Sequence, residues 1–284
     1  MKEDNLPFLR DSIRYLGFGE GSVLNEQVEK EIQKGVTEFQ LRTEAHFDEW
    51  SRIEAILHFR RSEQSDMYFF NKYEATLLYD NPIHNRSQTF YIYKGKGVTF
   101  KEAFNLLQGR SVNKNLTDSD GEKYNAWLKL SFGERTPNDT NYRTRQFRDQ
   151  YGYNLEEVLN NYPIRELQND QLKTSLIQSL KKGNIHLVTF AKASKIEKMY
   201  VEACPEFKTI IIYSETTRAA QRPSLPKGHH VNAGASVLFP DPENPSANGE
   251  QEEGKNEEQE PPAGGSESLN GSSAKKRSRR PDSL

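Results

Sequence analysis

The chain has 284 residues, of which 34% are hydrophobic, and its 39 basic side chains nearly balance its 41 acidic ones. This balance excludes a polycationic protein that binds nucleic acid non-specifically with its whole surface, because such affinity comes mainly from neutralising phosphates. The single cysteine, Cys204, excludes an intramolecular disulfide framework and a cysteine-rich zinc site. The length allows one large domain or two small ones.

The N-terminus and the hydropathy pattern predict a cytoplasmic protein with no membrane contact. The first residues, MKEDNLPFLRDSIRYLG, carry charges where a signal peptide needs an apolar run. No apolar stretch approaches the roughly 20 residues that a membrane-spanning helix needs.

Two short helices are predicted first, and strands follow them. Apolar residues recur at helical spacing in residues 7–16 and 24–34, and Gly17 and Gly35 follow as helix-ending glycines. The apolar period then changes to two, which is typical of half-buried antiparallel strands. The strands predicted from this alternation cover residues 39–47, 53–59, 67–70 and 73–79.

Residues 89–110, TFYIYKGKGVTFKEAFNLLQGR, predict a strand, a glycine loop and a capped helix. Thr99 can accept a hydrogen bond from an unpaired backbone N–H at the start of the helix, and Glu102 can reach back, which makes a capping box. The predicted buried stripe of the helix consists of Phe100, Ala103, Phe104 and Leu107.

After Gly109 we expect a short strand around residues 111–114, a turn at residues 118–121 and a strongly alternating strand at residues 125–132. The apolar face of that strand consists of Ala126, Leu128, Leu130 and Phe132. The segment GERTPNDTN at residues 133–141 is rich in Gly, Pro, Asn and Asp, so it predicts an exposed and mobile loop.

A degenerate copy of residues 89–110 occurs 55 positions further along, at residues 144–165. The aligned pairs are Gly97 with Gly152, Thr99 with Asn154, Glu102 with Glu157, and Phe100, Ala103 and Phe104 with Leu155, Val158 and Leu159. A shared glycine, cap residue, glutamate and apolar stripe indicate an internal duplication, although capping boxes also recur by chance. The period is too irregular for a solenoid of near-identical repeats.

The predicted fold class is α+β, with mostly antiparallel sheets and short capped helices in two related helix-plus-sheet units. The body covers residues 1–215, with the related units at about residues 20–140 and 141–215. Residues 216–284 are predicted to be a disordered tail, because their composition cannot bury enough apolar surface to offset the ordering entropy. The tail is acidic first, with nine acids and one lysine between Asp241 and Glu267, and ends in the basic run KKRSRR.

The loop KGKG is the strongest candidate for binding a small anion, because backbone N–H groups and the dipole at a helix start attract anions. Lys94 and Lys96 would add positive charge. The spacing matches neither the Walker A motif nor the dinucleotide fingerprint. The counterpart at residues 149–152 lacks both lysines and the first glycine, so the favoured interpretation is a structural loop.

No residue pattern indicates a reaction, a metal site or a cofactor. The histidines form no helical pair at metal-ligand spacing; they are His46, His58, His84, His186, His229 and His230. Cys204 precedes Pro205, with no sequence feature that predicts a lowered thiol pKa. There is no GxSxG, HExxH or kinase-like set of motifs. We therefore expect a non-enzymatic protein without a metal, a cofactor or a small-molecule ligand.

Basic residues interleaved with aromatic ones indicate a candidate nucleic-acid surface, since cations contact phosphates and rings stack on bases. In the folded body the cations are Lys94, Lys96, Arg143, Arg145 and Arg148. The alternative is that the aromatic residues are simply good strand formers. A second candidate is the basic end of the tail, a short tethered arm with the cations Lys275, Lys276, Arg277, Arg279 and Arg280. The alternative there is a solvated tail whose cations are partly masked by the acidic segment.

Five segments together resemble a known protein family. They are MYFFNKYEATL, RSQTFYIYKGKGVTFKEAFNLLQGR, GEKYNAWLKL, YGYNLEEVLNNYPIREL and EKMYVEACPEFKTIIIY. They resemble a domain-of-unknown-function family of hypothetical proteins encoded on conjugative transposons of Bacteroides-type bacteria. The resemblance covers roughly residues 11–213, and residues 100–130 are its most specific part. Members of this family often end, as this chain does, in a low-complexity charged tail.

The resemblance implies a setting, a mobile genetic element close to DNA processing or transfer. It supplies no catalytic residues, and the family pattern has a histidine where Arg148 stands here, so no metal or catalytic role is carried over to that position. We therefore expect a non-enzymatic accessory protein, a binding or scaffolding module whose basic tail contacts DNA, RNA or an acidic partner. Its expected partners are DNA, RNA or proteins of DNA transfer or processing.

The alternative function is a protein–protein interaction module, an adaptor or inhibitor of a host or transfer protein, without nucleic-acid contact. An exposed apolar patch on the folded sheet would favour this alternative. An enzyme would instead need a deep pocket with converging polar groups.

Overall fold

The computed structural model describes residues 5–19, 21–48, 51–79, 81–135, 141–192, 195–214 and 216. All of them belong to one compact unit, residues 1–239. The predicted disordered tail, residues 216–284, lies outside the described residues apart from Thr216, and so do residues 136–140 of the predicted mobile loop.

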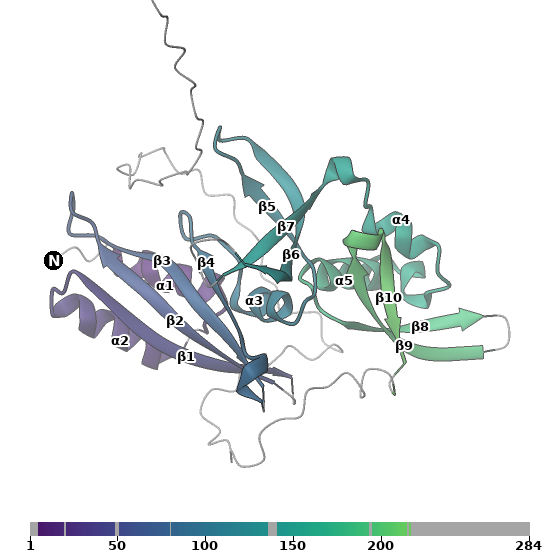
Figure 1. Ribbon diagram of the computed structural model, residues 1–284, viewed down its shortest axis with the longest axis horizontal. Coiled ribbons are helices and arrows are strands. Elements are labelled where there is room, and N and C mark those ends of the chain that lie inside the picture. The colour runs from purple at the N-terminus through teal and green to yellow at the C-terminus, as the bar shows by residue number, and fades with distance from the viewer. Residues whose placement is uncertain are drawn as a thin grey trace, which may run out of the picture. The chain divides into compact units, whose positions relative to one another are not determined.

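The fold is α+β, as predicted (Figure 1). The helices are α1 Asn5–Tyr15, α2 Ser22–Gln33, α3 Phe100–Leu107, α4 Leu155–Asn160 and α5 Asp170–Lys181. The strands are β1 Glu38–Asp48, β2 Ser51–Arg61, β3 Tyr68–Leu78, β4 Arg86–Tyr91, β5 Val112–Thr117, β6 Lys123–Arg135, β7 Tyr142–Arg148, β8 His186–Lys192, β9 Lys195–Cys204 and β10 Thr209–Tyr213. Short 3₁₀ turns lie at Pro82–His84, Asp149–Tyr151, Arg165–Gln168 and Pro205–Phe207. None of the helices within the described residues combines the length and apolar character that a membrane span requires.

The strands form three antiparallel sheets, in the orders β1-β2-β3-β4, β5-β6-β7 and β10-β9-β8. Two segments predicted separately, residues 67–70 and 73–79, are one continuous strand, β3. Its pairing with β2 shifts register between His58 and Phe59, because Asn71 is an extra residue opposite them. This bulge explains why Phe70 and Tyr73 are both buried although an odd number of positions separates them.

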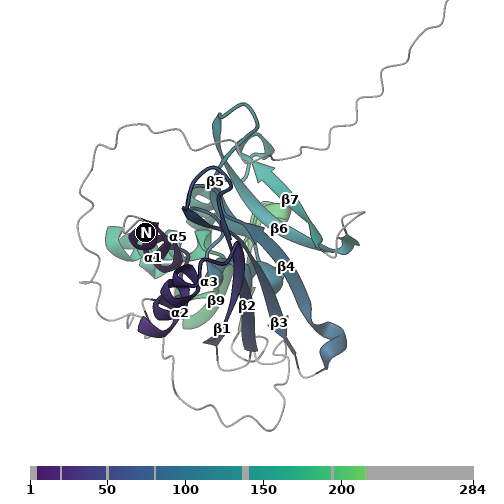
Figure 2. The same cartoon turned by 90° about the vertical axis from the view of Figure 1, so that its left-hand side faces the viewer.

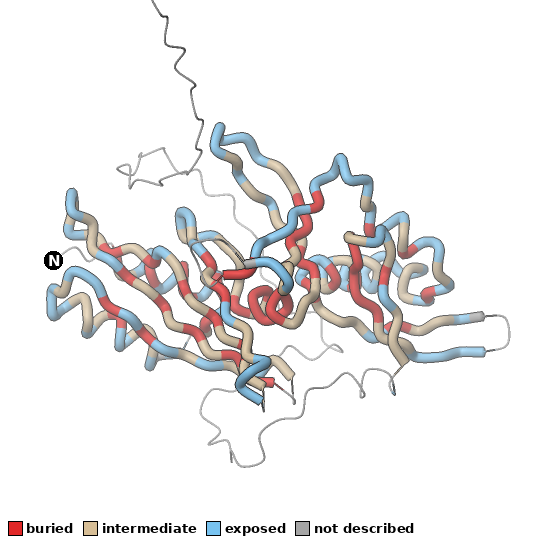
Figure 3. Tube along the Cα trace, viewed as in Figure 1, coloured by how far each residue is buried: buried red, intermediate tan, exposed pale blue. Residues whose placement is uncertain are grey.

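The first core lies between the sheet β1–β4 and the helices α1, α2 and α3, which cover the same face of the sheet (Figure 2). The sequence supplies this face by alternation along the strands and by helical spacing along α3, as predicted. Helix α3 is buried almost all round (Figure 3), and Phe100 and Phe104 are each 1% exposed. Phe18 stacks on Phe100 with ring centroids 4.8 Å apart, which ties the segment after α1 to α3.

Strand β6 contributes to both cores of the described chain. Leu128 and Leu130 belong to the first core, whereas Trp127, on the opposite face of the same strand, belongs to the second. Strand β6 therefore buries Trp127 in addition to residues of the predicted apolar face. The buried residues do not separate at residues 140 and 141, where the boundary between the two related units was predicted.

The second core lies between the helices α4 and α5 and one face of the sheet β10-β9-β8. Its central residues include Leu159, Leu176, Leu180 and Val201, none of which is exposed. The turn after α5 packs closely against the first part of the chain, because a Cβ added at Gly183 would lie 2.9 Å from the Ser111 oxygen. Asn105, fully buried on α3, also donates to the Lys182 carbonyl at 2.6 Å across this contact.

Two buried amide side chains imitate a neighbouring strand. Asn5 donates to the Tyr68 carbonyl at 3.0 Å and accepts from the Tyr68 N–H at 2.6 Å. Gln88 does the same with Tyr142, accepting from its N–H at 2.8 Å and donating to its carbonyl at 3.3 Å. Each amide therefore satisfies a buried peptide group that no strand reaches.

Both proposed copies of the repeat contain a strand, a loop and a helix with a side-chain cap. Thr99 and Glu102 form the predicted capping box of α3, and Asn154 accepts from the N–H groups of Glu156 and Glu157 at the start of α4. The aligned glycines differ, because Gly152 has a left-handed φ of 76° whereas the left-handed glycine of the first loop is Gly95, not Gly97. The duplication itself stays a prediction.

Candidate functional sites

The KGKG loop forms a tight two-residue turn. Lys94 and Gly95 have positive φ values of 49° and 72°, and the N–H and C=O groups of Tyr93 and Lys96 hydrogen-bond to each other at 2.8 and 2.9 Å. Two consecutive positive φ angles are typical of a hairpin turn, which favours glycine. A Cβ at Gly95 would lie 2.8 Å from Ser12 Oγ, so the turn rests against α1.

The N–H groups that could have bound an anion at the start of α3 are already hydrogen-bonded. Thr99 donates its N–H to Glu102 Oε2 at 2.8 Å, and Phe100 donates to the Leu16 carbonyl at 2.8 Å. The Glu102 carboxylate is only 8% exposed and pairs with Lys114 Nζ at 2.9 Å. A carboxylate thus occupies the position that a phosphate would need, which favours the structural interpretation of the loop. Lys94 lies 5.6 Å from the Tyr93 ring and takes no part in a cradle.

The arginines of β7, for which nucleic-acid contact was predicted, contact groups of the same chain. Arg143 pairs with Glu134 at 3.0 Å, and the Arg148 guanidinium lies 4.0 Å above the Tyr124 ring. Arg145 and Lys129 share Glu206, with Lys129 Nζ 2.6 Å from its carboxylate.

The hydrogen bond from Lys129, followed by the contacts with Arg145, holds the pKa of Glu206 below its ordinary value. The carboxylate therefore stays ionised and keeps both cations close. Arg148 projects from the face of β7 opposite to Arg143 and Arg145, because the side chains of a strand alternate. The structure thus brings Arg145 together with Lys129 but places Arg148 apart from them. The five tail cations, Lys275, Lys276, Arg277, Arg279 and Arg280, lie outside the described residues.

The surroundings of Cys204 and His58 do not favour nucleophilic or metal-binding chemistry. Burial raises the pKa of Cys204, so its thiol is protonated at neutral pH and a weak nucleophile. Burial, and then the nearby Lys72, lower the pKa of His58, whose Nε2 lies 3.0 Å from the Glu74 carboxylate. Across the described ranges, no three His, Cys, Asp or Glu side chains are grouped so that they could hold a metal ion.

A polar groove of about 450 Å³ lies between the middle sheet and the helices α4 and α5. Its wall on the sheet is a ladder of amides, in which Asn125 donates to Asn113 at 3.0 Å and to Asn115 at 2.7 Å. Its other lining residues include Trp127, Asp149, Tyr153, Asn154, Glu156, Glu157 and Lys181. The sequence did not indicate this groove, because its two walls are far apart in the chain.

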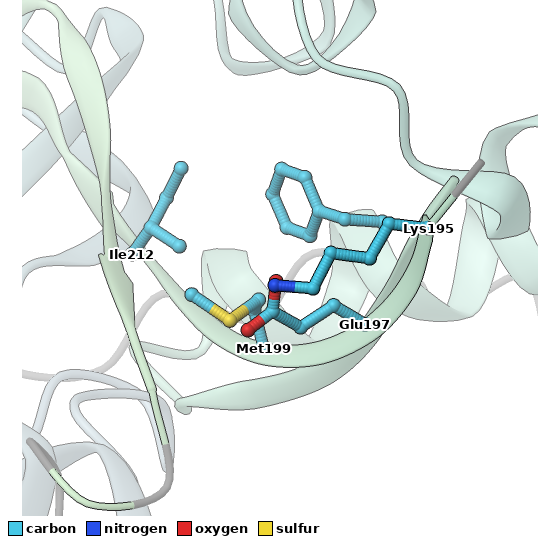
Figure 4. Close-up of a pocket in the computed structure, with 5 residues that line it drawn as sticks. Lys195, Glu197, Met199 and Ile212 are labelled. Carbon is cyan, nitrogen blue, oxygen red and sulfur yellow. The ribbon is translucent and has the colours of Figure 1, made fainter. Parts of the chain in front are cut away.

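An apolar pocket of about 220 Å³ lies on the sheet β10-β9-β8 (Figure 4). Phe190, Met199 and Ile212, one from each strand, form its apolar lining. Lys195 and Glu197 close one side, and their side chains form an ion pair with a distance of 2.9 Å. Sequence reasoning missed this pocket; the alternation of residues 195–201 was its only signal, and it becomes informative only once the three strands are paired.

The opposite face of this sheet is partly uncovered by the described residues. Leu187 is 42% exposed, Ile211 is 36% exposed and Ile196 is 70% exposed. Leu187 pairs directly with Tyr200 and Ile211 with Glu202, so residues of β8, β9 and β10 share this face. Apolar exposure at Leu187 and Ile211 is typical of a surface that binds another molecule, whereas Ile196 lies further along β9, opposite Ala191.

No protein-family model matches the chain, and neither a curated protein nor a solved structure resembles it closely enough to count as a match.

Proposed function

We propose that the chain is a non-enzymatic binding module of a mobile genetic element, acting in the cytoplasm, and that its folded part binds a protein partner. The apolar pocket formed by Phe190, Met199 and Ile212 is the observation that carries this proposal. The partner would insert one large apolar side chain into the pocket while its neighbouring residues contact the rim.

The size of the pocket favours a protein side chain over a small molecule. Its volume of about 220 Å³ is below the roughly 300–1,000 Å³ of typical small-molecule sites. The rim offers Lys195 and Glu197, which already neutralise each other at 2.9 Å. A ligand of strong single charge therefore gains little here, whereas an apolar anchor gains from leaving water.

The proposal is tested by affinity capture of the intact protein from its own cells, using wild type and Met199→Asp. Met199 is half-buried in the pocket, so a carboxylate there would repel an apolar anchor. The matched control is Ile196→Asp, on the other face of the same strand at a position that is 70% exposed. We expect a nuclease-resistant partner with wild type and the control and its loss with Met199→Asp. Equal capture by all three proteins would contradict the assignment to the pocket.

A second function is supported by the sequence of the tail. KKRSRR places five cations in six positions, whereas Arg143, Arg145 and Lys129 of the body pair with carboxylates of the same chain. We therefore assign any nucleic-acid contact to the tail, in the DNA-transfer setting that the family resemblance implies.

Titration of the full-length protein and of a truncation ending at Arg222 against single- and double-stranded DNA, at several salt concentrations, tests this assignment. Binding through the tail predicts affinity that falls with salt and disappears on truncation. Binding that survives truncation unchanged would move the contact to the body, and absence of binding at low salt would remove the nucleic-acid function.

A further inference from the structure

The edge strands of the three sheets differ in charge. Six strands lie at sheet edges: β1, β4, β5, β7, β8 and β10. The first five each carry at least one charged residue, for example Arg86 in β4 and Lys114 in β5. Strand β10, with the sequence TIIIY, carries none. Charged side chains on an edge strand discourage pairing with another chain, so β10 lacks the protection that the other edges have.

Two of the other edges are also closed by hydrogen bonds. Along the outer side of β4, the Gln88 side chain hydrogen-bonds to the backbone of Tyr142. On the same side, Asn141 accepts from the Thr89 N–H at 2.7 Å. The outer side of β8 is occupied by Pro163, whose carbonyl accepts from Ala191 at 2.9 Å. Further along β8, the Glu166 carboxylate accepts from the Thr189 N–H at 3.0 Å.

On β10, hydrogen bonds from other elements reach only the first residue. Tyr153 donates its hydroxyl to the Thr209 carbonyl at 3.0 Å, and the Tyr162 hydroxyl lies 3.3 Å from Thr209 Oγ1. Within the described part of the chain, the backbone of residues 211–213 is paired with β9 alone. Among the described residues, the end of β10 therefore presents unpaired backbone groups and an uncharged apolar side-chain sequence along one open edge.

We propose that this edge pairs with β10 of a second copy of the chain, antiparallel and centred on Ile211. A two-fold axis at Ile211 sets Ile210 opposite Ile212 and Thr209 opposite Tyr213, so apolar residues meet apolar residues. The two three-stranded sheets then become one continuous sheet of six strands across the dimer.

Charge beside β10 favours the antiparallel orientation of a second copy. Lys208 directly precedes the strand. Antiparallel pairing centred on Ile211 keeps the two copies of Lys208 at opposite ends of the pair, whereas parallel pairing would place these like charges side by side. No charged residue lies within Thr209–Tyr213, so the centre of the pair contains no like-charge contact.

The short strand sets the expected strength of the dimer. β10 has only five residues, while stable protein interfaces bury roughly 1,200–2,000 Å². We therefore expect a reversible dimer whose population rises with protein concentration. The pairing uses the edge of the sheet, whereas the proposed partner pocket uses its face, so either proposal can fail without the other.

Sedimentation velocity of the full-length protein over a range of concentrations tests the dimer. Ile211→Lys places two like charges opposite each other at the two-fold axis, and we expect dimerisation to weaken at least about tenfold. The variant should fold, because residue 211 is 36% exposed and its cross-strand neighbour is Glu202. The control, Ile196→Lys, lies on the same sheet away from β10 and should dimerise like wild type. A wild type that stays monomeric at every concentration, or an Ile211→Lys variant that dimerises normally, overturns the proposal.

Cross-linking gives a second measurement that does not depend on dimer strength. Ile211→Cys should be joined between copies by a short bis-maleimide, whereas Ile196→Cys should not, because only residue 211 meets its own copy. The native Cys204 is 4% exposed and serves as an internal background in both variants. Equal cross-linking of the two variants, or none of Ile211→Cys, contradicts antiparallel pairing at β10, including the case in which the edge binds a strand of another protein.

Discussion

The sheets β1–β4 and β10-β9-β8 are both antiparallel, and both have helices on one face, but their other faces differ. The outer face of β1–β4 carries ion pairs. Arg52, for example, contacts Glu44 at 3.4 Å and Glu54 at 3.1 Å. The corresponding face of β10-β9-β8 exposes Leu187, Ile196 and Ile211. A charged outer face discourages association, whereas an apolar one favours it.

This difference separates the sheet that packs on the larger core from the sheet that offers a contact surface. The first core contains the largest fully buried side chains, including Tyr73, Phe59, Phe100 and Phe104. The C-terminal sheet has a smaller core and keeps an apolar pocket, an apolar face and an open edge. The following variants test that division.

The largest effect is expected in the first core. Phe104→Ala should lower the free energy of unfolding by about 3–5 kcal/mol, because a fully buried ring leaves a cavity. Phe207→Ala, at a position that is 74% exposed on the C-terminal part, should change it by less than about 0.5 kcal/mol. Urea denaturation measures both, and similar losses in the two variants would contradict the tight packing of Phe104 in the first core.

Gly183→Ala tests the contact between the turn after α5 and Ser111, which directly precedes β5. The left-handed φ of 79° and the 2.9 Å approach of an added Cβ to the Ser111 oxygen predict a loss of about 2–4 kcal/mol. Gly121→Ala is the matched control, since Gly121 has φ of 85° but no atom within 4 Å of the added Cβ. Its loss should be limited to backbone strain of about 1–2 kcal/mol. Equal losses in thermal melts would show that the close packing at Gly183 contributes nothing.

The two helix caps compare the proposed copies directly. Thr99→Ala removes one half of the capping box of α3 and should cost about 1 kcal/mol. Asn154→Ala removes the cap of α4, which accepts from two N–H groups at 3.1 and 3.4 Å, and should cost a similar amount. Denaturation of both variants measures the difference, and a cap without effect in one copy would show that the two helices depend on different contacts.

A pH dependence of stability is expected to originate in the first core. Burial, and then the nearby Arg110, lower the pKa of Lys101 to about 7, whereas the pKa of an unfolded lysine is roughly 10.4. Between these values the unfolded chain binds more protons, so the free-energy cost of charging buried Lys101 is fully present below about pH 7 and is relieved as pH rises towards 10. We expect wild type to gain stability over pH 7–9.5 relative to Lys101→Met. Parallel stability curves for the two proteins would contradict the lowered pKa.

Local patterns in the sequence predicted the first three helices, the strands of the sheet β1–β4 and the capping box, because these features depend on neighbouring residues. The bulge at Asn71 was not predicted, although the change of phase between Phe70 and Tyr73 is its signature. The alternation of β6 indicated one buried face, but Trp127 on the other face is also buried, because a second core forms there from distant residues.

The candidate sites were harder to predict than the fold. Arg145 and Lys129 are basic in the sequence, but their common partner, Glu206, comes from a distant turn. The apolar pocket needs Phe190, Met199 and Ile212 from three strands, and nothing local marks them as neighbours. Such sites depend on strand pairing, which a single sequence does not specify.

The side-chain amide of Asn5 links the start of α1 to β3. Its nitrogen donates to the Tyr68 carbonyl at 3.0 Å while its oxygen accepts from the Tyr68 N–H. Deamidation to aspartate keeps the acceptor but replaces the donor with an oxygen, so two oxygens would face each other in a buried position. Asn5→Asp should therefore detach the start of α1 from β3. The melting temperature of this variant measures that loss, and a variant with unchanged melting would contradict it.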